Sequence, residues 1–209
     1  ANDEELEWAT EIFEKNNFWC SNFLDLNDPM EGIFYCSSGE IIRKSYELKK
    51  AYKICSFCNK EAFENPAMWG YYANAFKGMA IKIKVDDSVV RIINYVNNIS
   101  EVTNPITGSI EKILTTKYDS WKHEAEFRFM KKSEENRHKI GEIVGVYFGD
   151  PYGDVENKQE IKKDSESLRD YYGRKKKLEG IANNKGIEVH TVKIEGGKVQ
   201  EVVRKKRSC

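Results

Sequence analysis

Charged and uncharged residues alternate without a break in the segment EAEFRF, which runs from Glu124 to Phe129. In an extended strand, side chains two positions apart share a face, so Glu124, Glu126 and Arg128 would line one side. Ala125, Phe127 and Phe129 would pack on the other side. Two carboxylates about 6.6 Å apart along a strand repel each other unless a cation or a substrate hydroxyl group lies between them. The segment therefore predicts a half-buried strand that carries a row of charges.

Two interpretations of this row of charges remain open. It is the solvated face of an ordinary half-buried strand, or it is a row of carboxylates aimed into a cleft. In the second case one carboxylate would hold a sugar hydroxyl group while positive charge develops at the anomeric carbon. If the segment were helical instead, Glu124 and Arg128 would form an ordinary ion pair one turn apart.

The rest of the chain mixes short strands with irregularly placed helices, which favours an α+β fold with mixed, largely antiparallel sheets flanked by helices. A length of 209 residues indicates a single domain over 1–209. Besides the strand over 124–130, strands are expected over 18–20, 79–85, 142–148, 187–194 and 198–203, the last two joined at Gly196-Gly197. Helices are expected over 4–15, 110–121 and 156–184, the last one interrupted near Gly173. The segment 89–96 is expected to form a helical turn that leads into a strand.

A further helix is predicted from Asn65-Pro66, an N-cap followed by proline in the first turn, to a left-handed end at Gly78. Its apolar positions at helical spacing are Met68, Tyr72, Ala75 and Phe76. At the other end of the chain, Asn2 and Glu5 could form a capping box for the first helix. The polar stretch 97–109 is expected to be a loop.

Composition excludes some classes of function. Lys+Arg and Asp+Glu are equal at 34 each, so no global field draws the chain to nucleic acid or to a membrane. The basic runs 174–177 and 204–207 are expected to be a solvated helix face and a frayed tail. No apolar stretch of about 20 residues and no signal peptide is visible, so a cytoplasmic protein without a membrane partner is expected.

The five cysteines are irregularly spaced, and reduced thiols are expected. Cys55 and Cys58 form a lone CxxC motif, which would need two more ligands, such as Cys20 and Cys36, to hold zinc. We expect no metal here, and we expect Cys55 to be a small buried residue in a short strand.

Two further segments carry candidate binding residues. In Asn27-Asp28-Pro29-Met30-Glu31, the polar side chains either cap a proline turn or point together at a ligand. In Met68-Trp69-Gly70-Tyr71-Tyr72, the three aromatic residues Trp69, Tyr71 and Tyr72 span more than half of the helix circumference. At least one should therefore be partly exposed, where it could stack on a planar ring.

Three motifs, in their order along the chain, resemble those of a bacterial domain-of-unknown-function family. They are N-D-P-x-E at 27–31, M-W-x-x-Y at 68–72 with a following G-x-x-I at 78–81, and W-x-x-E-x-E-x-R at 121–128. The resemblance covers about residues 18–150. The layout is also distantly similar to ADP-ribosyltransferases, which split NAD on a two-lobed α+β fold. That similarity implies that NAD is the substrate and that Glu126 holds the ribose hydroxyl and stabilises the transition state. It also implies that Glu124 orients an unknown acceptor, a protein or a nucleic acid, and that Tyr71 or Tyr72 stacks near nicotinamide.

One feature departs from that similarity. ADP-ribosyltransferases lead us to expect a short strand with an aromatic or histidine residue before the first helix, whereas this chain begins at Ala1, already at that helix. Either the sequence is truncated or the element is absent, and its absence would favour a non-catalytic module.

Three functions therefore stay open. The first is an NAD-consuming ADP-ribosyltransferase or NAD glycohydrolase, which needs a cleft shared by Glu126 and an aromatic residue. The second is a non-catalytic nucleotide- or peptide-binding domain, which predicts that Glu126 is satisfied by Arg128 or Lys122. The third is a magnesium-dependent nuclease with Asp28, Glu31, Glu124 and Glu126 as oxygen ligands.

Overall fold

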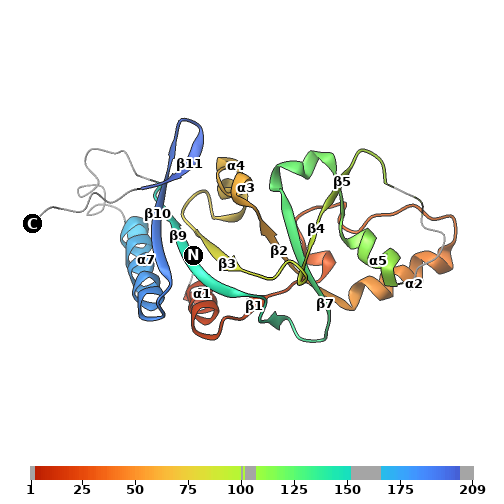
Figure 1. The fold of residues 1–209 in the computed structure, drawn as a ribbon, viewed down its shortest axis with the longest axis horizontal. Helices are drawn as coiled ribbons and strands as arrows, with labels where there is room; N and C mark the ends of the chain where they lie inside the picture. Colours follow the sequence, from red (N-terminus) through yellow and green to blue (C-terminus); the bar gives the residue numbers. More distant parts are fainter. Residues whose placement is uncertain (1–2, 100, 102–106, 152–165, 203–209) are drawn as a thin grey trace, which may run out of the picture. The chain divides into compact units, whose positions relative to one another are not determined.

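The computed structural model describes residues 3–99, 101, 107–151 and 166–202 (Figure 1). The chain is α+β with mostly antiparallel sheets, so the predicted fold class is confirmed. It divides into two compact units, each assembled from separate stretches of the sequence. The first unit comprises Ala1–Asn17, Phe63–Lys84 and Gly141–Cys209, and the second comprises Phe18–Ala62 and Val85–Ile140. That the whole chain folds as one domain stays a prediction.

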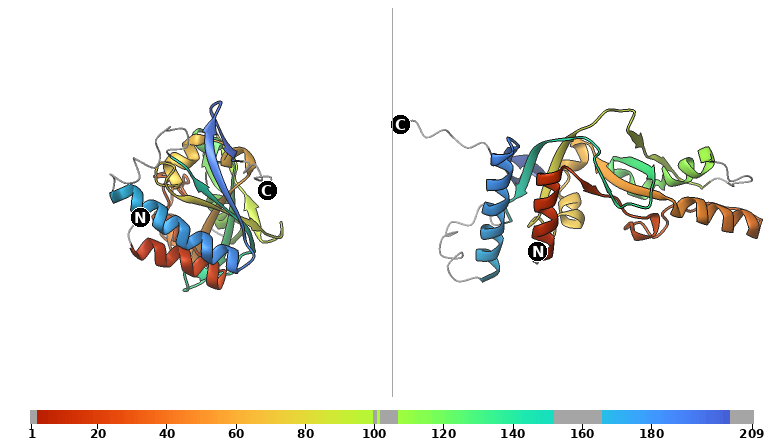
Figure 2. Two further views of the ribbon diagram at one scale, coloured as in Figure 1. Left: turned by 90° about the vertical axis from the view of Figure 1, so that its left-hand side faces the viewer. Right: turned by 90° about the horizontal axis from the view of Figure 1, so that it is seen from below.

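The first unit is built on a four-stranded sheet in the order β11-β10-β9-β3. Strand β9 pairs antiparallel with β3 and parallel with β10, and β10 forms an antiparallel hairpin with β11. The hairpin glycines Gly196 and Gly197 have φ angles of 58° and 76°, as the predicted tight turn requires. Helices α1 and α7 lie side by side (Figure 2). The bounds are α1 Asp3–Lys15, α4 Pro66–Tyr72, β3 Met79–Lys84, β9 Glu142–Gly149, α7 Glu166–Asn184, β10 Glu188–Glu195 and β11 Lys198–Glu201.

Helix α4 begins as predicted, with the Asn65 side chain accepting a hydrogen bond from the backbone N–H of Ala67 at 3.0 Å. Its predicted end is wrong, and of the predicted apolar positions Phe76 is buried whereas Tyr72 and Ala75 are exposed. The helix stops at Tyr72, because Asn74, Ala75 and Phe76 all have positive φ angles. Trp69, Ala73 and Phe76 pack in one cluster with Val192 of β10 and Val199 of β11.

Gly78 is not the left-handed terminator of that helix. A Cβ atom at this position would lie 2.9 Å from the backbone of Ala73, and the Gly78 N–H donates to the Ala73 carbonyl at 2.7 Å. A close approach of two backbone segments therefore explains the glycine.

The second unit contains a three-stranded antiparallel sheet, β2-β7-β4, and the two-stranded pairs β1-β8 and β5-β6, of which the second is parallel. Helices α2 and α5 and two 3-10 helices complete the unit, and the short helix α3 lies where the chain passes into the first unit. The bounds are β1 Phe18–Trp19, α2 Gly39–Lys50, β2 Tyr52–Cys58, α3 Lys60–Phe63, β4 Val90–Ile92, β5 Asn94–Val96, α5 Thr107–Leu114, β6 Thr116–Tyr118, β7 Glu126–Lys132 and β8 Arg137–His138, with 3-10 helices at Phe23–Asp25 and Asp119–Glu124.

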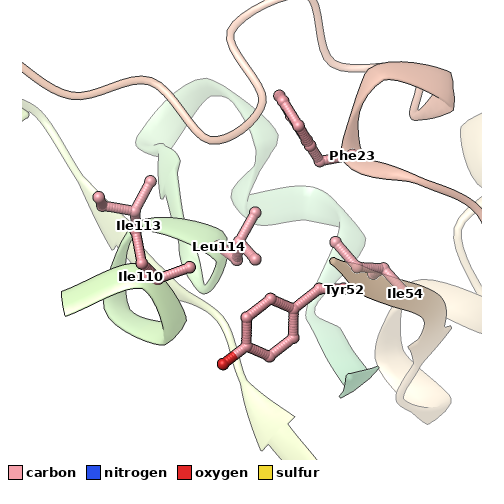
Figure 3. Close-up of a cluster of buried hydrophobic side chains, with 6 residues drawn as sticks. All are labelled: Phe23, Tyr52, Ile54, Ile110, Ile113 and Leu114. Atoms are coloured by element: carbon pink, nitrogen blue, oxygen red, sulfur yellow. The ribbon is translucent and has the colours of Figure 1, made fainter. Parts of the chain in front are cut away.

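A hydrophobic cluster holds the second unit together (Figure 3). Tyr52 and Ile54 of β2 form one cluster with residues of α5 and with Phe23 of the first 3-10 helix. The α5 members are Ile110, Ile113 and Leu114. Leu114 is fully buried, and its place at the end of α5 matters for the site described below.

Several predicted elements differ in their limits. The helix expected over 110–121 ends at Leu114 and is followed by β6 and a 3-10 helix. The segment 89–96 forms β4 and β5 rather than a helical turn and a strand. Helix α7 runs through Gly173 without interruption.

Other expectations fall on residues that the structure does not describe. These are the N-cap at Asn2, positions 100 and 102–106 of the loop expected over 97–109, the first part of the helix over 156–184, the residue Val203 and the basic run 204–207. The end of that expected loop is wrong, since residues 107–109 belong to helix α5. In the described part, no helix combines the length and the apolar character needed to cross a bilayer.

Two glycines of the first unit predict opposite effects of the same substitution. A Cβ atom on Gly149 would lie 2.1 Å from the carbonyl oxygen of Phe76, whereas one on Gly173 would meet nothing within 4 Å. We expect Gly149→Ala to lower the free energy of unfolding by about 1–3 kcal/mol because backbone must shift. Gly173→Ala, inside a helix, should raise it by about 0.5–1 kcal/mol.

Urea denaturation of the two variants and the parent measures both effects. Equal stability of Gly149→Ala and the parent would contradict the close approach of Gly149 to Phe76. A loss of stability in Gly173→Ala would contradict a continuous helix at that position.

Candidate functional site

The guanidinium group of Arg128, in strand β7, is fully buried and all five of its N–H groups donate hydrogen bonds. Glu31 accepts two of them, from Nη1 at 2.6 Å and from Nη2 at 2.7 Å. Glu126 accepts another two, from Nε at 2.6 Å and from Nη2 at 3.2 Å. The last goes from Nη1 to the backbone carbonyl of Leu114 at 2.6 Å. Arg128 therefore has no N–H group left for a substrate.

A second cation, Lys117 of β6, lies between the other carboxylates. Its ammonium group is 2.6 Å from Glu124 Oε2 and 2.8 Å from Glu126 Oε2, and all three side chains are buried. The ammonium group also lies 5.2 Å from the ring centroid of Trp121, within the range of a cation–π contact. We call Glu31, Lys117, Glu124, Glu126 and Arg128 the buried charge network. It contains three carboxylates and two cations.

Glu124 reaches the network by a route that the sequence pattern does not show. The predicted strand would have put it on the same strand face as Glu126, but Glu124 is the last residue of the 3-10 helix. Ala125 then takes a left-handed conformation with φ of 41°, and β7 begins at Glu126. The Tyr95 hydroxyl accepts a hydrogen bond from the backbone N–H of Glu126 at 2.9 Å. The turn at Ala125, rather than strand alternation, brings the two glutamates to one lysine.

The turn at Asp28 delivers Glu31 to the same network. Asp28 Oδ1 accepts a hydrogen bond from the backbone N–H of Met30 at 2.9 Å, and the Asp28 carbonyl accepts one from the N–H of Glu31 at 3.0 Å. This is the capping role that a proline turn predicts. The second oxygen of Asp28 is buried and has no hydrogen-bond partner in the described part of the chain. Asn27 is exposed.

Lys49 of α2 lies close to this turn. Its ammonium group donates to the carbonyl of Gly32 at 2.8 Å and lies 4.5 Å and 5.2 Å from the ring centroids of Phe23 and Phe34. Burial lowers the pKa of Lys49, and the nearby charge of Glu31 opposes that shift. A buried cation thus fixes the chain just beyond Glu31.

The network keeps its groups charged. Burial by itself would raise the pKa of Glu126, but Arg128 and Lys117 outweigh burial and lower it. Burial would likewise lower the pKa of Lys117, and Glu126 and Glu124 together raise it. The pKa of Arg128 is also raised, by its two carboxylate partners against the effect of burial. At neutral pH these three side chains are therefore ionised.

The structure separates the predicted site residues into two groups. Glu31, Glu124, Glu126 and Arg128 come together in the second unit, with Asp28 in the adjoining turn. The aromatic residues belong to the first unit, where Trp69 is buried at 3% exposure and donates from Nε1 to the Phe63 carbonyl at 2.8 Å. Tyr71 and Tyr72 are 69% and 47% exposed. The roles of all these residues in binding or catalysis stay predictions.

Lys117 is the residue of the network that sequence reasoning did not place there, because nothing in the sequence distinguished it from Lys122. The number of carboxylates in the network could have indicated a second cation. Three buried carboxylates need more than one cation, since an unpaired charge in the interior costs several kcal/mol.

No group of three or more His, Cys, Asp or Glu side chains that could hold a metal ion occurs among the described residues. Comparisons with protein-family models, curated proteins and solved structures gave no match.

Removing the buried cation should be far worse than removing an exposed one. Arg128→Ala removes the cation that binds Glu31 and leaves Glu126 with Lys117 alone, so we expect a loss of about 3–5 kcal/mol in the free energy of unfolding. Arg128→Lys keeps the charge but offers only three donors, and should lose less. The matched control is Arg91→Ala, which removes an exposed arginine paired with Arg128 in the β4–β7 register and should change stability by no more than about 0.5 kcal/mol. Urea denaturation measures all three, and similar losses for Arg128→Ala and Arg91→Ala would contradict the network.

The lowered pKa of Glu126 predicts acid sensitivity. A carboxylate with a depressed folded-state pKa contributes stability above its unfolded-state pKa, near the ordinary value of 4.5, and loses it as the pH falls through the folded-state value. We expect the parent to lose stability steeply below about pH 4.5, and Glu126→Gln, although less stable, to have a shallower slope there. The exposed Glu134→Gln is the control. Identical slopes for Glu126→Gln and the parent, measured by denaturation at a series of pH values, would refute this assignment.

Proposed function

We propose that this chain is a nucleotide-binding domain that does not consume NAD, and that the buried charge network is its structural support. The observation that carries the proposal is the state of Glu126. Both of its carboxylate oxygens accept from Arg128, and Oε2 is also 2.8 Å from Lys117. The residue is only 4% exposed. This is the satisfied ion pair that the non-catalytic hypothesis predicts.

An NAD-consuming enzyme would need Glu126 in a different state. To stabilise positive charge on the ribose, a carboxylate must face the sugar with an oxygen that becomes better satisfied in the transition state. Glu126 would have to leave Arg128 or Lys117 to do so. That exchange would strand a buried cation, which costs several kcal/mol. The enzymatic hypothesis keeps one point in its favour, since the lowered pKa holds Glu126 in the ionised form that it requires.

The exposed tyrosines of α4 support binding of a nucleotide. Tyr71 and Tyr72 are neighbouring exposed aromatic side chains of the first unit, with ring centroids 6.3 Å apart at an interplanar angle of 73°. Trp69, on the same helix, packs inward and anchors it. Stacking of a base on an exposed aromatic ring contributes about 1–3 kcal/mol. We therefore expect a nucleobase to stack on one of these two exposed rings.

Two measurements with NAD as the probe test the proposal. We expect isothermal titration calorimetry to detect NAD binding by the full chain, and we expect no nicotinamide release above that of buffer. Tyr71→Ala and Tyr72→Ala should each weaken binding by about 5- to 150-fold, the equivalent of 1–3 kcal/mol per stacked base. Trp8→Ala removes another exposed aromatic residue of the first unit and should bind as the parent does.

The outcomes separate the hypotheses. Nicotinamide release by the parent that is lost in Glu126→Gln would overturn the proposal in favour of an NAD-consuming enzyme. An absence of NAD binding, or equal binding by the tyrosine variants and the parent, would refute a nucleotide site at α4.

A further inference from the structure

Cys20 and Cys55 face each other across two antiparallel segments of the second unit. Next to them, Ser21 and Ile54 exchange both backbone hydrogen bonds, each with an N···O distance of 2.8 Å. In antiparallel pairing, the next pair along is a non-hydrogen-bonded one, with Cα atoms about 4.5 Å apart and side chains close together. Cys20 and Cys55 occupy that position, and each thiol shifts the pKa of the other. The Cys20 thiol also donates a hydrogen bond to the carbonyl of Phe18 at 3.7 Å.

This geometry suits a disulfide bond, whereas the CxxC motif does not. Disulfides join residues whose Cα atoms are about 4.4–6.8 Å apart. Cys55 and Cys58 both lie in strand β2, three residues apart, so their Cα atoms are about 10 Å apart and their side chains point to opposite faces. The Cys36 sulfur forms hydrogen bonds with the backbone carbonyl and N–H of Ser38.

We propose that Cys20 and Cys55 form a redox-active dithiol, which hydrogen peroxide converts to an intramolecular disulfide. Cys55, the more exposed of the two, loses its proton to solvent and attacks the peroxide first, and its raised pKa slows this step. The O–O bond breaks, Cys55 becomes a sulfenic acid and one water molecule leaves. Cys20 then attacks the Cys55 sulfur, the S–O bond breaks and a second water molecule leaves. Two thiols are oxidised by two electrons in total, and one peroxide is reduced to two waters.

The electrostatics of the pair favour the second step, the attack by Cys20. The hydrogen bond with Cys55 lowers the pKa of the Cys20 thiol, against the effect of burial. The same hydrogen bond, together with burial, raises the pKa of Cys55. The thiolate is the form that attacks in disulfide formation, and Cys20 is the member of the pair in which it is favoured.

Oxidation would close a loop that contains the Asp28 turn and Glu31. One end of this loop would be tied to β2, which pairs with β7, the strand of Arg128 and Glu126. Because a cross-link restricts the unfolded chain, the oxidised protein should be the more stable form. The disulfide would therefore hold the segment that contains Glu31 to the sheet that carries Arg128, whose charge Glu31 compensates.

Peptide mapping of the full chain tests the proposal. The protein is reduced with dithiothreitol, desalted, treated with hydrogen peroxide, alkylated and digested with trypsin. We expect the intact mass before alkylation to fall by two hydrogen atoms and the Cys20 peptide to be joined to the peptide that contains Cys55. Trypsin leaves Cys20 and Cys36 in one peptide between Lys15 and Arg43, and Cys55 and Cys58 in another between Lys53 and Lys60. Cys36→Ser and Cys58→Ser are therefore both needed to assign the bond. Both variants should cross-link as the parent does, and Cys55→Ser should not.

A thermal measurement supplies an independent readout. We expect the Tm of the oxidised parent to exceed that of the reduced parent and to return after dithiothreitol, with no such shift in Cys55→Ser. A bond between Cys55 and Cys58 would overturn the proposal. So would alkylation of both Cys20 and Cys55 after peroxide treatment that oxidises the exposed Cys58. Both of these outcomes are read on the parent protein, and so they do not depend on whether a variant folds.

Discussion

A buried guanidinium group needs a partner for each of its N–H groups, because an unsatisfied charge in the interior costs several kcal/mol. Arg128 meets this requirement with Glu31, Glu126 and the carbonyl of Leu114. These partners come from three parts of the second unit, which are a turn, the β7 strand itself and the end of α5. The position of each part is therefore coupled to the others through one side chain. The hydrophobic cluster that includes Leu114 lies against the same junction.

This constraint also bears on how the acidic residues are understood. An acidic row in a strand invites comparison with catalytic carboxylates, but here Arg128 and Lys117 compensate their charge. A carboxylate already satisfied in the ground state has little to gain in a transition state. The N-D-P-x-E and E-x-E-x-R motifs acquire a common explanation, since Glu31 of the first binds Arg128 of the second. Their joint presence in one chain follows from an ion pair as readily as from a shared substrate.

Much of the fold was predictable from short-range pattern. The strands β3, β7 and β9, the hairpin at Gly196-Gly197 and the start of α4 agree with the sequence reasoning because neighbouring residues decide each of them. The helix expected over 110–121 was wrong after Leu114, since tertiary pairing with β5 makes Thr116–Tyr118 a strand. For the site, the acidic and basic members at positions 31, 124, 126 and 128 were identified, although Glu124 comes from a turn. Lys117 was not assigned to the site, because nothing in the sequence distinguished it from Lys122.

The sequence by itself determined the local conformations, which include the alternating strands, the proline turn at Asp28 and the Asn65 cap, because these depend on residues a few positions apart. Only the tertiary structure decided which groups meet. Glu31 and Arg128 are 97 positions apart, and Cys55 lies opposite the distant Cys20 rather than facing the neighbouring Cys58. Pairings of this kind depend on the burial of charge and on the register between distant strands. No periodicity within a single segment carries that information.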